Sequence, residues 1–194
     1  MKSILVINGH PDPADEHLCH ALARAYQDAA REAGHNSDLI RIADLDFPVL
    51  RIPSEFENEP TPEPLRPARD ALLGADHLVL VSPLWLGTLP AYTKAFLEQI
   101  LYHDTAFERH EQGRWPKGKF HDKSARIVLT MGMPALAYRL WFRAHGLKNL
   151  QRNILGFVGF RTVRSTLFGM VGEPDPVRFE GWFDKMRDLD RKAA

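Results

Sequence analysis

Cysteine is almost absent from this 194-residue chain, and neither sign of charge is in excess. Cys19 is the single cysteine, which excludes an intrachain disulfide and a cluster of thiolate metal ligands. Lysine plus arginine and aspartate plus glutamate each number 25, so the formal net charge is zero. This balance gives no reason to expect nucleic acid or an anionic membrane surface as a partner.

Long apolar runs are missing as well. No uninterrupted stretch approaches the roughly 20 residues that a membrane-spanning helix needs. The amino-terminal segment lacks the long apolar region and the cleavage site of a secretory signal. We therefore expect a cytoplasmic protein without an integral membrane segment. A hydrophobic content of 44% over this length suits one domain, covering residues 1–194.

The hydrophobic pattern alternates between short apolar runs and helical periods. It predicts strands over residues 3–8, 38–42, 77–81, 126–130 and 160–167. It predicts helices over residues 16–33, 67–73, 90–102, 135–153 and 175–191, the fourth of them broken at Gly146. Two polar stretches, 46–67 and 103–124, are expected to form long loops.

This alternation indicates parallel βαβ units, so we predict an α/β fold. The expected sheet is open and doubly wound, with five parallel strands and helices on both faces. In such sheets ligands bind beyond the carboxyl ends of the strands, where the strand order reverses. That rule selects three loops as the candidate site, at residues 9–19, 83–87 and 130–133.

The first loop, GHPDPADEHLCH, is neither a GxGxxG fingerprint nor a GxxxxGK[ST] phosphate loop, which weighs against an ordinary dinucleotide or ATP site. A strand-to-helix turn still offers backbone N–H groups and a positive helix end to an anion. His10 and His17 could donate to a phosphate, while Asp15 and Glu16 are expected to cap the helix and fill its first turn. The alternative is that both histidines are merely solvated.

A metal site is a further alternative for the same loop. His17 and His20 are three residues apart and could share a helix face, with His10 and Asp12 approaching from the turn. The set lacks a sharp ligand spacing such as HExxH, so we predict no metal.

The second and third loops carry few charges. In SPLWLGTLPAYTK, prolines and a glycine around Trp85 make a stiff apolar turn, which could cover a flat heterocycle or simply bury a core tryptophan. In TMGMPALAY, Gly132 lets the backbone approach a ligand and Thr130 offers a hydroxyl. Tyr138 and His145 follow, seven residues apart and nearly on one face of the predicted helix. They could act as a pair that transfers protons or stabilises charge, or they could be ordinary packed residues.

Taken together, these segments resemble the flavodoxin-like NAD(P)H:quinone reductase family of the DT-diaphorase type. INGHPDP with HLCHALA resembles the family's phosphate-binding turn and helix. SPLWLGTLPAYTKAFLEQIL, LTMGMPALAY, the AHG that follows and NILGFVGFRTV resemble its later segments in the same order. The resemblance therefore runs through most of the chain.

The resemblance implies a bound flavin, FAD or FMN, with NAD(P)H as co-substrate, a quinone-like acceptor, ping-pong chemistry and a homodimer with the site at the subunit interface. We favour FAD, because the 103–124 loop could cover an adenosine. Tyr138 and His145 are implied as catalytic residues that stabilise negative charge on the reduced flavin. The implied flavin contacts are His10, His17, Leu18 and Cys19 at the phosphate, Pro83, Leu84, Trp85, Leu86 and Gly87 along the ring, and Thr130, Met131, Gly132 and Met133 at its pyrimidine side.

The chain departs from the family at a few of these positions. His17 stands where relatives usually carry Ser or Thr, Cys19 where they often carry Asn, and Met133 where they have the second glycine of a pair. A different class of function stays open beside the enzyme. Some relatives are regulatory or ancillary subunits of membrane transporters, and YRLWFRAHGLKNLQRN could be a docking face or a packed dimer helix.

Overall fold

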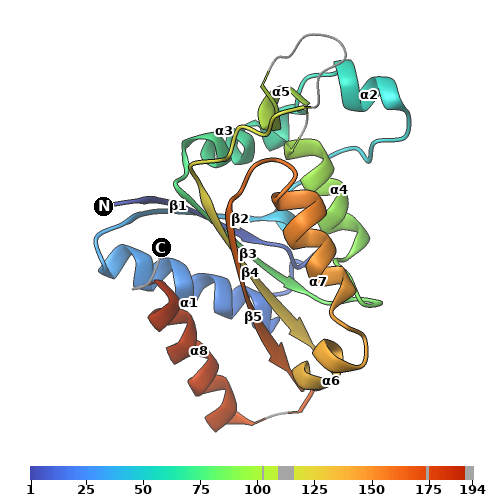
Figure 1. The fold of residues 1–194 in the computed structure, drawn as a ribbon. Coiled ribbons are helices and arrows are strands. Elements are labelled where there is room, and N and C mark those ends of the chain that lie inside the picture. The colour runs from blue at the N-terminus through green and yellow to red at the C-terminus, as the bar shows by residue number, and fades with distance from the viewer. Residues whose placement is uncertain (102, 109–115, 174, 191–194) are drawn as a thin grey trace.

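Five parallel strands form the centre of the molecule, in the order β2-β1-β3-β4-β5 (Figure 1). The computed structural model describes residues 1–101, 103–108, 116–173 and 175–190. Its strands are β1 Ser3–Asn8, β2 Asn36–Arg41, β3 His77–Pro83, β4 Ser124–Met131 and β5 Thr162–Gly169. All four pairings are parallel, and the strand order reverses beside β1. This confirms the predicted open, doubly wound sheet.

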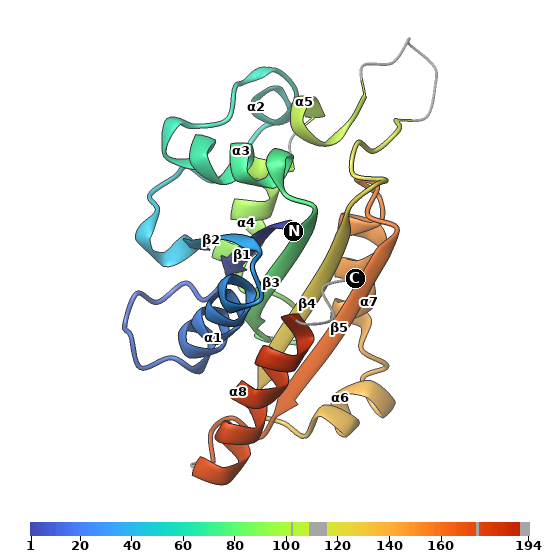
Figure 2. The same cartoon turned by 90° about the vertical axis from the view of Figure 1, so that its left-hand side faces the viewer.

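Helices cover both faces of this sheet. Figures 1 and 2 show α1 and α8 on one face and α3, α4 and α7 on the other. The helices are α1 Leu18–Glu32, α2 Pro53–Asn58, α3 Arg66–Gly74, α4 Ala91–Ile100, α5 His103–Ala106, α6 Ala135–Leu140, α7 His145–Asn149 and α8 Pro176–Asp190. Two 3₁₀ turns, η1 Ile42–Asp44 and η2 Glu63–Leu65, and a π-helical segment, η3 Leu150–Leu155, complete the set for the part of the chain described above.

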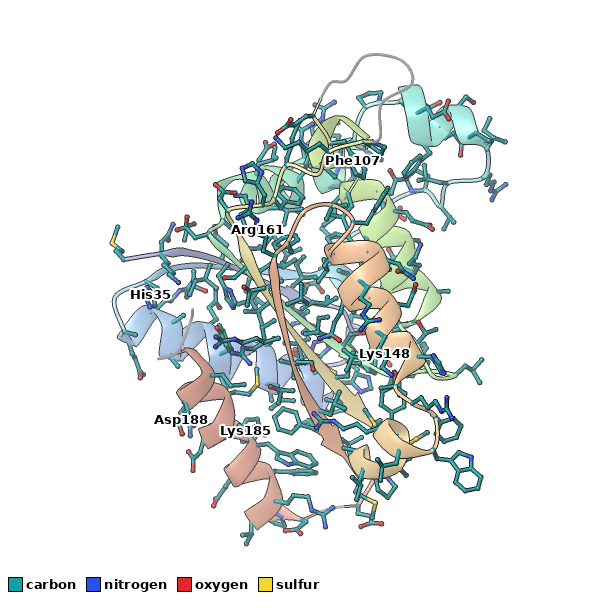
Figure 3. The ribbon with its side chains drawn as sticks, viewed as in Figure 1. His35, Phe107, Lys148, Arg161, Lys185 and Asp188 are labelled. Carbon is teal, nitrogen blue, oxygen red and sulfur yellow. The ribbon has the colours of Figure 1, made fainter. Side chains whose placement is uncertain are left out.

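The core has two halves because successive strand residues point to opposite faces. On the α1 and α8 side, Val6 and Val79 pack with Leu22 and Tyr26 of α1. On the other side, Leu80 packs with Phe96 of α4 and with residues of α3 and η3. On the first of these faces, Lys185 of α8 lies over the Phe168 ring of β5, with 5.8 Å from Nζ to the ring centroid (Figure 3). Both faces of the sheet are therefore buried, as the continuous apolar runs predict.

The end of α1 shows why the helix stops where the sequence predicts. Gly34 has a φ of +82°, a left-handed conformation that glycine adopts without steric cost. The Gly34 N–H donates to the carbonyl of Arg31, and the His35 N–H donates to the carbonyl of Ala30, at 3.0 and 2.9 Å. This pair of bonds is a Schellman motif, which closes the helix and turns the chain into β2.

Two expectations about helices are wrong. The stretch 46–67 is not free of helix, because Pro53 starts α2 and the Glu55 carboxylate accepts the backbone N–H of Arg51 at 2.6 Å. The predicted helix 135–153 breaks before Gly146, at Arg143 and Ala144, whose φ values are +51° and +49°. The part of the predicted loop 103–124 that holds residues 109–115 lies outside the described residues. Among the described helices, none is long and apolar enough to cross a membrane.

Candidate functional site

A pocket of about 360 Å³ opens at the carboxyl end of the sheet, beside the start of α1. It is bounded by the β1–α1 loop, by β3 and the turn that follows it, by β4 and by α8. Its lining residues are His10, Glu16, His17, Leu18, Cys19, Pro83, Trp85, Thr130, Val171 and Phe179. The pocket therefore lies where the strand order reverses, which is the ligand position in doubly wound sheets.

The sequence predicts seven of these lining residues as ligand contacts: His10, His17, Leu18, Cys19, Pro83, Trp85 and Thr130. Three others escaped prediction. Glu16 was expected only as a helix cap, and Val171 and Phe179 lie far along the chain in the loop before α8 and in α8 itself. Phe179 has one weak signal, its spacing of three from Trp182, which brings the two rings to 5.2 Å between centroids.

The expectation that acids cap α1 is wrong. His17 is the residue at the amino-terminal cap, no side chain bonds the first N–H groups there, and the first turn of α1 holds no acid. Asp15 instead accepts from Arg24 and Arg41, at 3.0 and 2.9 Å. The first N–H groups of a helix have no acceptor within the helix, so the start of α1 leaves backbone donors beside the pocket.

Three histidines and one carboxylate are joined by short contacts in the β1–α1 loop. The His10 and His17 rings stack with 3.9 Å between centroids and 22° between planes. The Asp12 carboxylate lies 2.9 Å from Nε2 of His17, and the backbone N–H of Asp12 donates to Nδ1 of His10 at 3.2 Å. Nε2 of His20 is 2.9 Å from the Asp12 carbonyl oxygen, and its Nδ1 bonds the Asn8 amide. The histidines are therefore held by the loop rather than simply solvated.

The second loop is a tight turn whose tip is exposed. Trp85 and Thr88 exchange backbone hydrogen bonds of 2.9 and 3.0 Å, and Leu86 and Gly87 between them have φ values of +48° and +83°. Positive φ at both central positions is typical of a type I′ turn. Leu86 is strained there because it has a side chain. Trp85 is 49% exposed, so it offers apolar surface to a ligand and does not fill the core.

Two hydrogen-bonding side chains lie at the floor of the pocket, Thr130 from the end of β4 and Cys19 from the first turn of α1. The Thr130 hydroxyl lies 3.2 Å from the Cys19 thiol, and both side chains are buried. Burial raises the pKa of the Cys19 thiol to about 12, so it stays protonated. Beyond them, a Cβ atom built on Gly132 would meet no atom within 4 Å, which leaves the backbone open to approach.

The remaining predicted contacts do not line this pocket. Leu84 donates its N–H to the Thr130 carbonyl at 2.8 Å and packs its side chain against the core. Met131 is buried, and the Met133 carbonyl accepts the Met170 N–H at 3.2 Å. Leu86, Gly87 and Gly132 are not among the lining residues either, and the contact of all six residues with a ligand stays a prediction.

Tyr138 and His145 do not share a helix face, contrary to the prediction. The break at 141–144 puts Tyr138 in α6 and His145 at the start of α7, where His145 is exposed. The Tyr138 ring is buried, and its hydroxyl donates to the Gly87 carbonyl at 3.2 Å and accepts the Leu147 N–H at 3.0 Å. Burial raises the pKa of Tyr138, which keeps the hydroxyl a donor. Tyr138 therefore ties α7 to the turn at 85–88.

Removing this hydroxyl should destabilise the protein. Tyr138→Phe leaves the Leu147 N–H and the Gly87 carbonyl without their partner, at a cost of about 1–2 kcal/mol in the free energy of unfolding. Urea denaturation measures this loss. His145→Gln is the matched control, because an exposed side chain should change stability little. Equal midpoints for Tyr138→Phe and the parent would contradict the role given to the hydroxyl.

The fold and the pocket define a class: doubly wound α/β proteins with a ligand pocket at the topological switch point and a helix start beside it. A family model described as "Flavodoxin-like fold" matches residues 2–188, so the chain belongs to this family. Across the described ranges, no group of three or more histidine, cysteine, aspartate or glutamate side chains is arranged to hold a metal ion.

Known proteins with enzyme names are similar to this chain. A protein of Haemophilus influenzae named as an uncharacterized NAD(P)H oxidoreductase is 26% identical over 169 residues, which are 85% of this chain and 82% of that protein. An FMN-dependent NADH:quinone oxidoreductase of Bacillus pumilus is 27% identical over 150 residues, 68% of this chain and 70% of the relative. The solved NAD(P)H:quinone oxidoreductase from Methanothermobacter marburgensis shares the fold, with a TM-score of 0.78, 18% identity, and 100% and 99% of the two chains covered.

Proposed function

We propose that this protein is a flavin-dependent NAD(P)H oxidoreductase that reduces quinones or related acceptors. The observation that carries the proposal is the pocket at the start of α1, because it joins residues from all three loops predicted as flavin contacts. Both sequence relatives are named as oxidoreductases, which favours the enzyme over a regulatory subunit of a transporter. Residues 1–194 would form one flavodoxin-like domain. A cytoplasmic location stays a prediction from the sequence.

The pocket fits a flavin mononucleotide at both ends. At the helix end, the first N–H groups of α1 and the imidazoles of His10 and His17 can donate to a phosphate. At the other end, half-exposed Trp85 offers a flat apolar surface, and the open space beside Gly132 leaves room for a ring edge to meet the backbone. The B. pumilus relative is named FMN-dependent, which favours FMN over the FAD that the sequence suggests.

When bound, the flavin would accept a hydride from NAD(P)H and then pass two electrons to a quinone. The balance is one NAD(P)H, one quinone and one proton consumed for one NAD(P)⁺ and one hydroquinone. The chain's own part is to bind and orient the ring between Trp85, Pro83 and Thr130. Tyr138 and His145 are proposed to stabilise negative charge at the ring. To donate to the ring, the Tyr138 hydroxyl would have to give up its hydrogen bond to the Gly87 carbonyl. Its first role is therefore to position the 85–88 turn.

We extend the proposal to a homodimer with the pocket at the subunit interface. The side chains of Leu86, Leu140 and Trp141 are 106%, 71% and 84% exposed. Tyr138 of α6 bonds the Gly87 carbonyl next to Leu86, so α6, which carries Leu140 at its end, lies beside the turn that follows the pocket residue Trp85. Exposed apolar patches of this kind mark association surfaces.

One spectrum tests the proposed function. The purified protein should be yellow, or should bind FMN on reconstitution, and mass analysis of the released cofactor should give FMN. Addition of NADH or NADPH should bleach the flavin absorbance, and a quinone should restore it. A protein that stays colourless and binds neither FMN nor FAD would rule the proposal out.

A further inference from the structure

The strand β5 has a free edge. It is the last strand in the sheet order, so it pairs with β4 on one side and with no described strand on the other. In Figure 1 this outer edge faces the viewer between α8 and α7, and no described helix or strand lies in front of it. An edge of this kind presents backbone N–H and C=O groups to which another chain can pair.

The backbone of alternate residues points outward along this edge. The Val163 carbonyl accepts the side-chain amide of Gln151 at 3.1 Å, so the backbone of Val163 faces away from β4. Alternate residues of a strand direct their backbone groups to the same side, so Ser165 and Leu167 also face outward. Among the described residues, no side chain or loop donates to or accepts from the backbone of Ser165 or Leu167. These groups are therefore open to a partner.

Two hollows flank this edge. One of about 310 Å³ is lined in part by Ser165 and Leu167, and one of about 460 Å³ is lined in part by Val163. Every charged residue that lines them is a cation. These cations are Arg139 and Lys185 in the first hollow, and Arg152 and Arg161 in the second. Figure 3 shows Arg161 near the start of β5 and Lys185 on α8, beside the later half of the strand.

The four cations of these hollows lack acidic partners. None of them forms an ion pair with aspartate or glutamate within the described ranges. At the opposite edge of the sheet, by contrast, Arg41 of β2 is bound by Asp15 and Asp44, at 2.9 and 3.4 Å. The chain carries equal numbers of both signs, so the edge of β5 concentrates unbalanced positive charge. Charge of one sign on a binding surface favours a partner of the opposite sign.

We propose that the edge of β5 binds an extended acidic peptide segment of a partner protein, which adds to the five-stranded sheet as a further strand. Backbone groups of the peptide pair with Ser165 and Leu167, and its carboxylates meet the four cations in the flanking hollows. The outward span 163–167 suits a peptide of about five to seven residues. A second copy of β5 is disfavoured there, because two such edges bring like charges together.

This surface is separate from the proposed flavin pocket, with which the two hollows share no lining residue. Peptide binding therefore does not depend on the proposed function. Cations on an edge strand can also serve to prevent edge-to-edge aggregation. That role requires charge alone, whereas strand addition requires the backbone groups of β5 as well, and a measurement can separate the two.

Fluorescence anisotropy of a labelled peptide tests the proposal. The probe is a seven-residue peptide in which glutamate alternates with valine. The parent protein should bind it, and added salt should weaken the binding, because the ionic contacts are exposed. The same peptide with every backbone amide methylated keeps its charges but cannot donate to the strand edge. Its affinity should be lower by about tenfold, as expected for the loss of two hydrogen bonds.

Two kinds of variant separate backbone pairing from charge. Ser165→Pro removes one outward N–H, which an edge strand tolerates, and should weaken peptide binding about fivefold, whereas Ser165→Ala should not. The double variant Arg161→Glu with Lys185→Glu reverses two charges beside the edge and should weaken binding by at least about tenfold. Arg51→Glu, at an exposed position before α2, is the matched control and should bind like the parent. Thermal melting checks that each variant is folded.

The outcomes are distinct. A parent protein that does not bind the peptide in low salt would overturn the proposal, and so would equal binding of the methylated peptide, which would reduce the contact to charge alone. Tighter binding of a seven-nucleotide oligothymidylate would assign the edge to nucleic acid, and self-association that Ser165→Pro abolishes would assign it to a second copy. Flavin binding by Ser165→Pro should match that of the parent, so failure of peptide binding leaves the proposed oxidoreductase intact.

Discussion

Gly146→Ala should lower the free energy of unfolding by about 3 kcal/mol, at the upper end for a methyl group added to a packed contact. A Cβ atom at this position would lie 2.0 Å from the Gly87 carbonyl oxygen and 3.0 Å from Cα of Thr88. Both neighbours are backbone atoms of the turn at 85–88, so neither can swing aside. The variant should also bind FMN less tightly, because α7 would push this turn out of place.

Gly74→Ala is the matched control for this substitution. Gly74 is the last residue of α3, and a Cβ atom there would meet nothing within 4 Å. The control should therefore be neutral or slightly stabilising, since alanine restricts the unfolded chain. Guanidinium denaturation of both variants measures the difference. If the two variants unfold at the same denaturant concentration, α7 does not depend on its contact with Gly87.

Acid should destabilise the protein through His77, well before its carboxylates are protonated. Burial is the largest cause that lowers the pKa of His77 to about 4, and the positive charges of Arg126, Lys2 and Arg164 lower it further. Its Nδ1 lies 2.7 Å from the Ser124 hydroxyl at the start of the neighbouring strand. The folded protein therefore holds this ring neutral where the unfolded chain would protonate it.

The sign of the effect follows from proton uptake. Between pH 6.5 and pH 4 the unfolded chain binds a proton at His77 that the folded protein does not, so stability falls as the pH falls through this range. The difference between the two pKa values corresponds to about 3 kcal/mol, present in full above pH 6.5. His77→Gln should lose this dependence, whereas His121→Gln, at an exposed position, should keep it. Parallel curves for the parent and His77→Gln, measured by urea denaturation at several pH values, would contradict the assignment.

The sheet could be predicted from the sequence because each strand is a short apolar run buried on both faces, as in Leu78–Leu80 of β3. The breaks in helices were harder to predict. Arg143 and Ala144 adopt left-handed backbone without a glycine, and what holds them is the Tyr138 hydroxyl on Leu147 together with Gly146 on Gly87. These are contacts between segments, which a local propensity does not contain.

The sequence predicted those residues of the candidate site whose position follows from the sheet topology alone. Residues at the ends of β1, β3 and β4 are fixed by the topology, so His17, Trp85 and Thr130 could be assigned to one pocket. Val171 and Phe179 reach that pocket only because α8 packs against α1. The acids of the first loop were assigned to the wrong partners, because Asp15 meets Arg24 and Arg41 across the fold and not the helix start.

Two contacts fix the start of α7, and they bear on how the length of the α6–α7 connection can vary among relatives of this chain. Leu147 is fixed by Tyr138, and Gly146 is fixed by Gly87, so the position of α7 does not depend on the number of residues between the helices. The exposed residues 141–143 can absorb an insertion or a deletion as a loop, without moving either end. The number of residues between Tyr138 and His145 is therefore a poor guide for aligning this chain with its relatives. Gly146, with its contact to Gly87, is the better reference point.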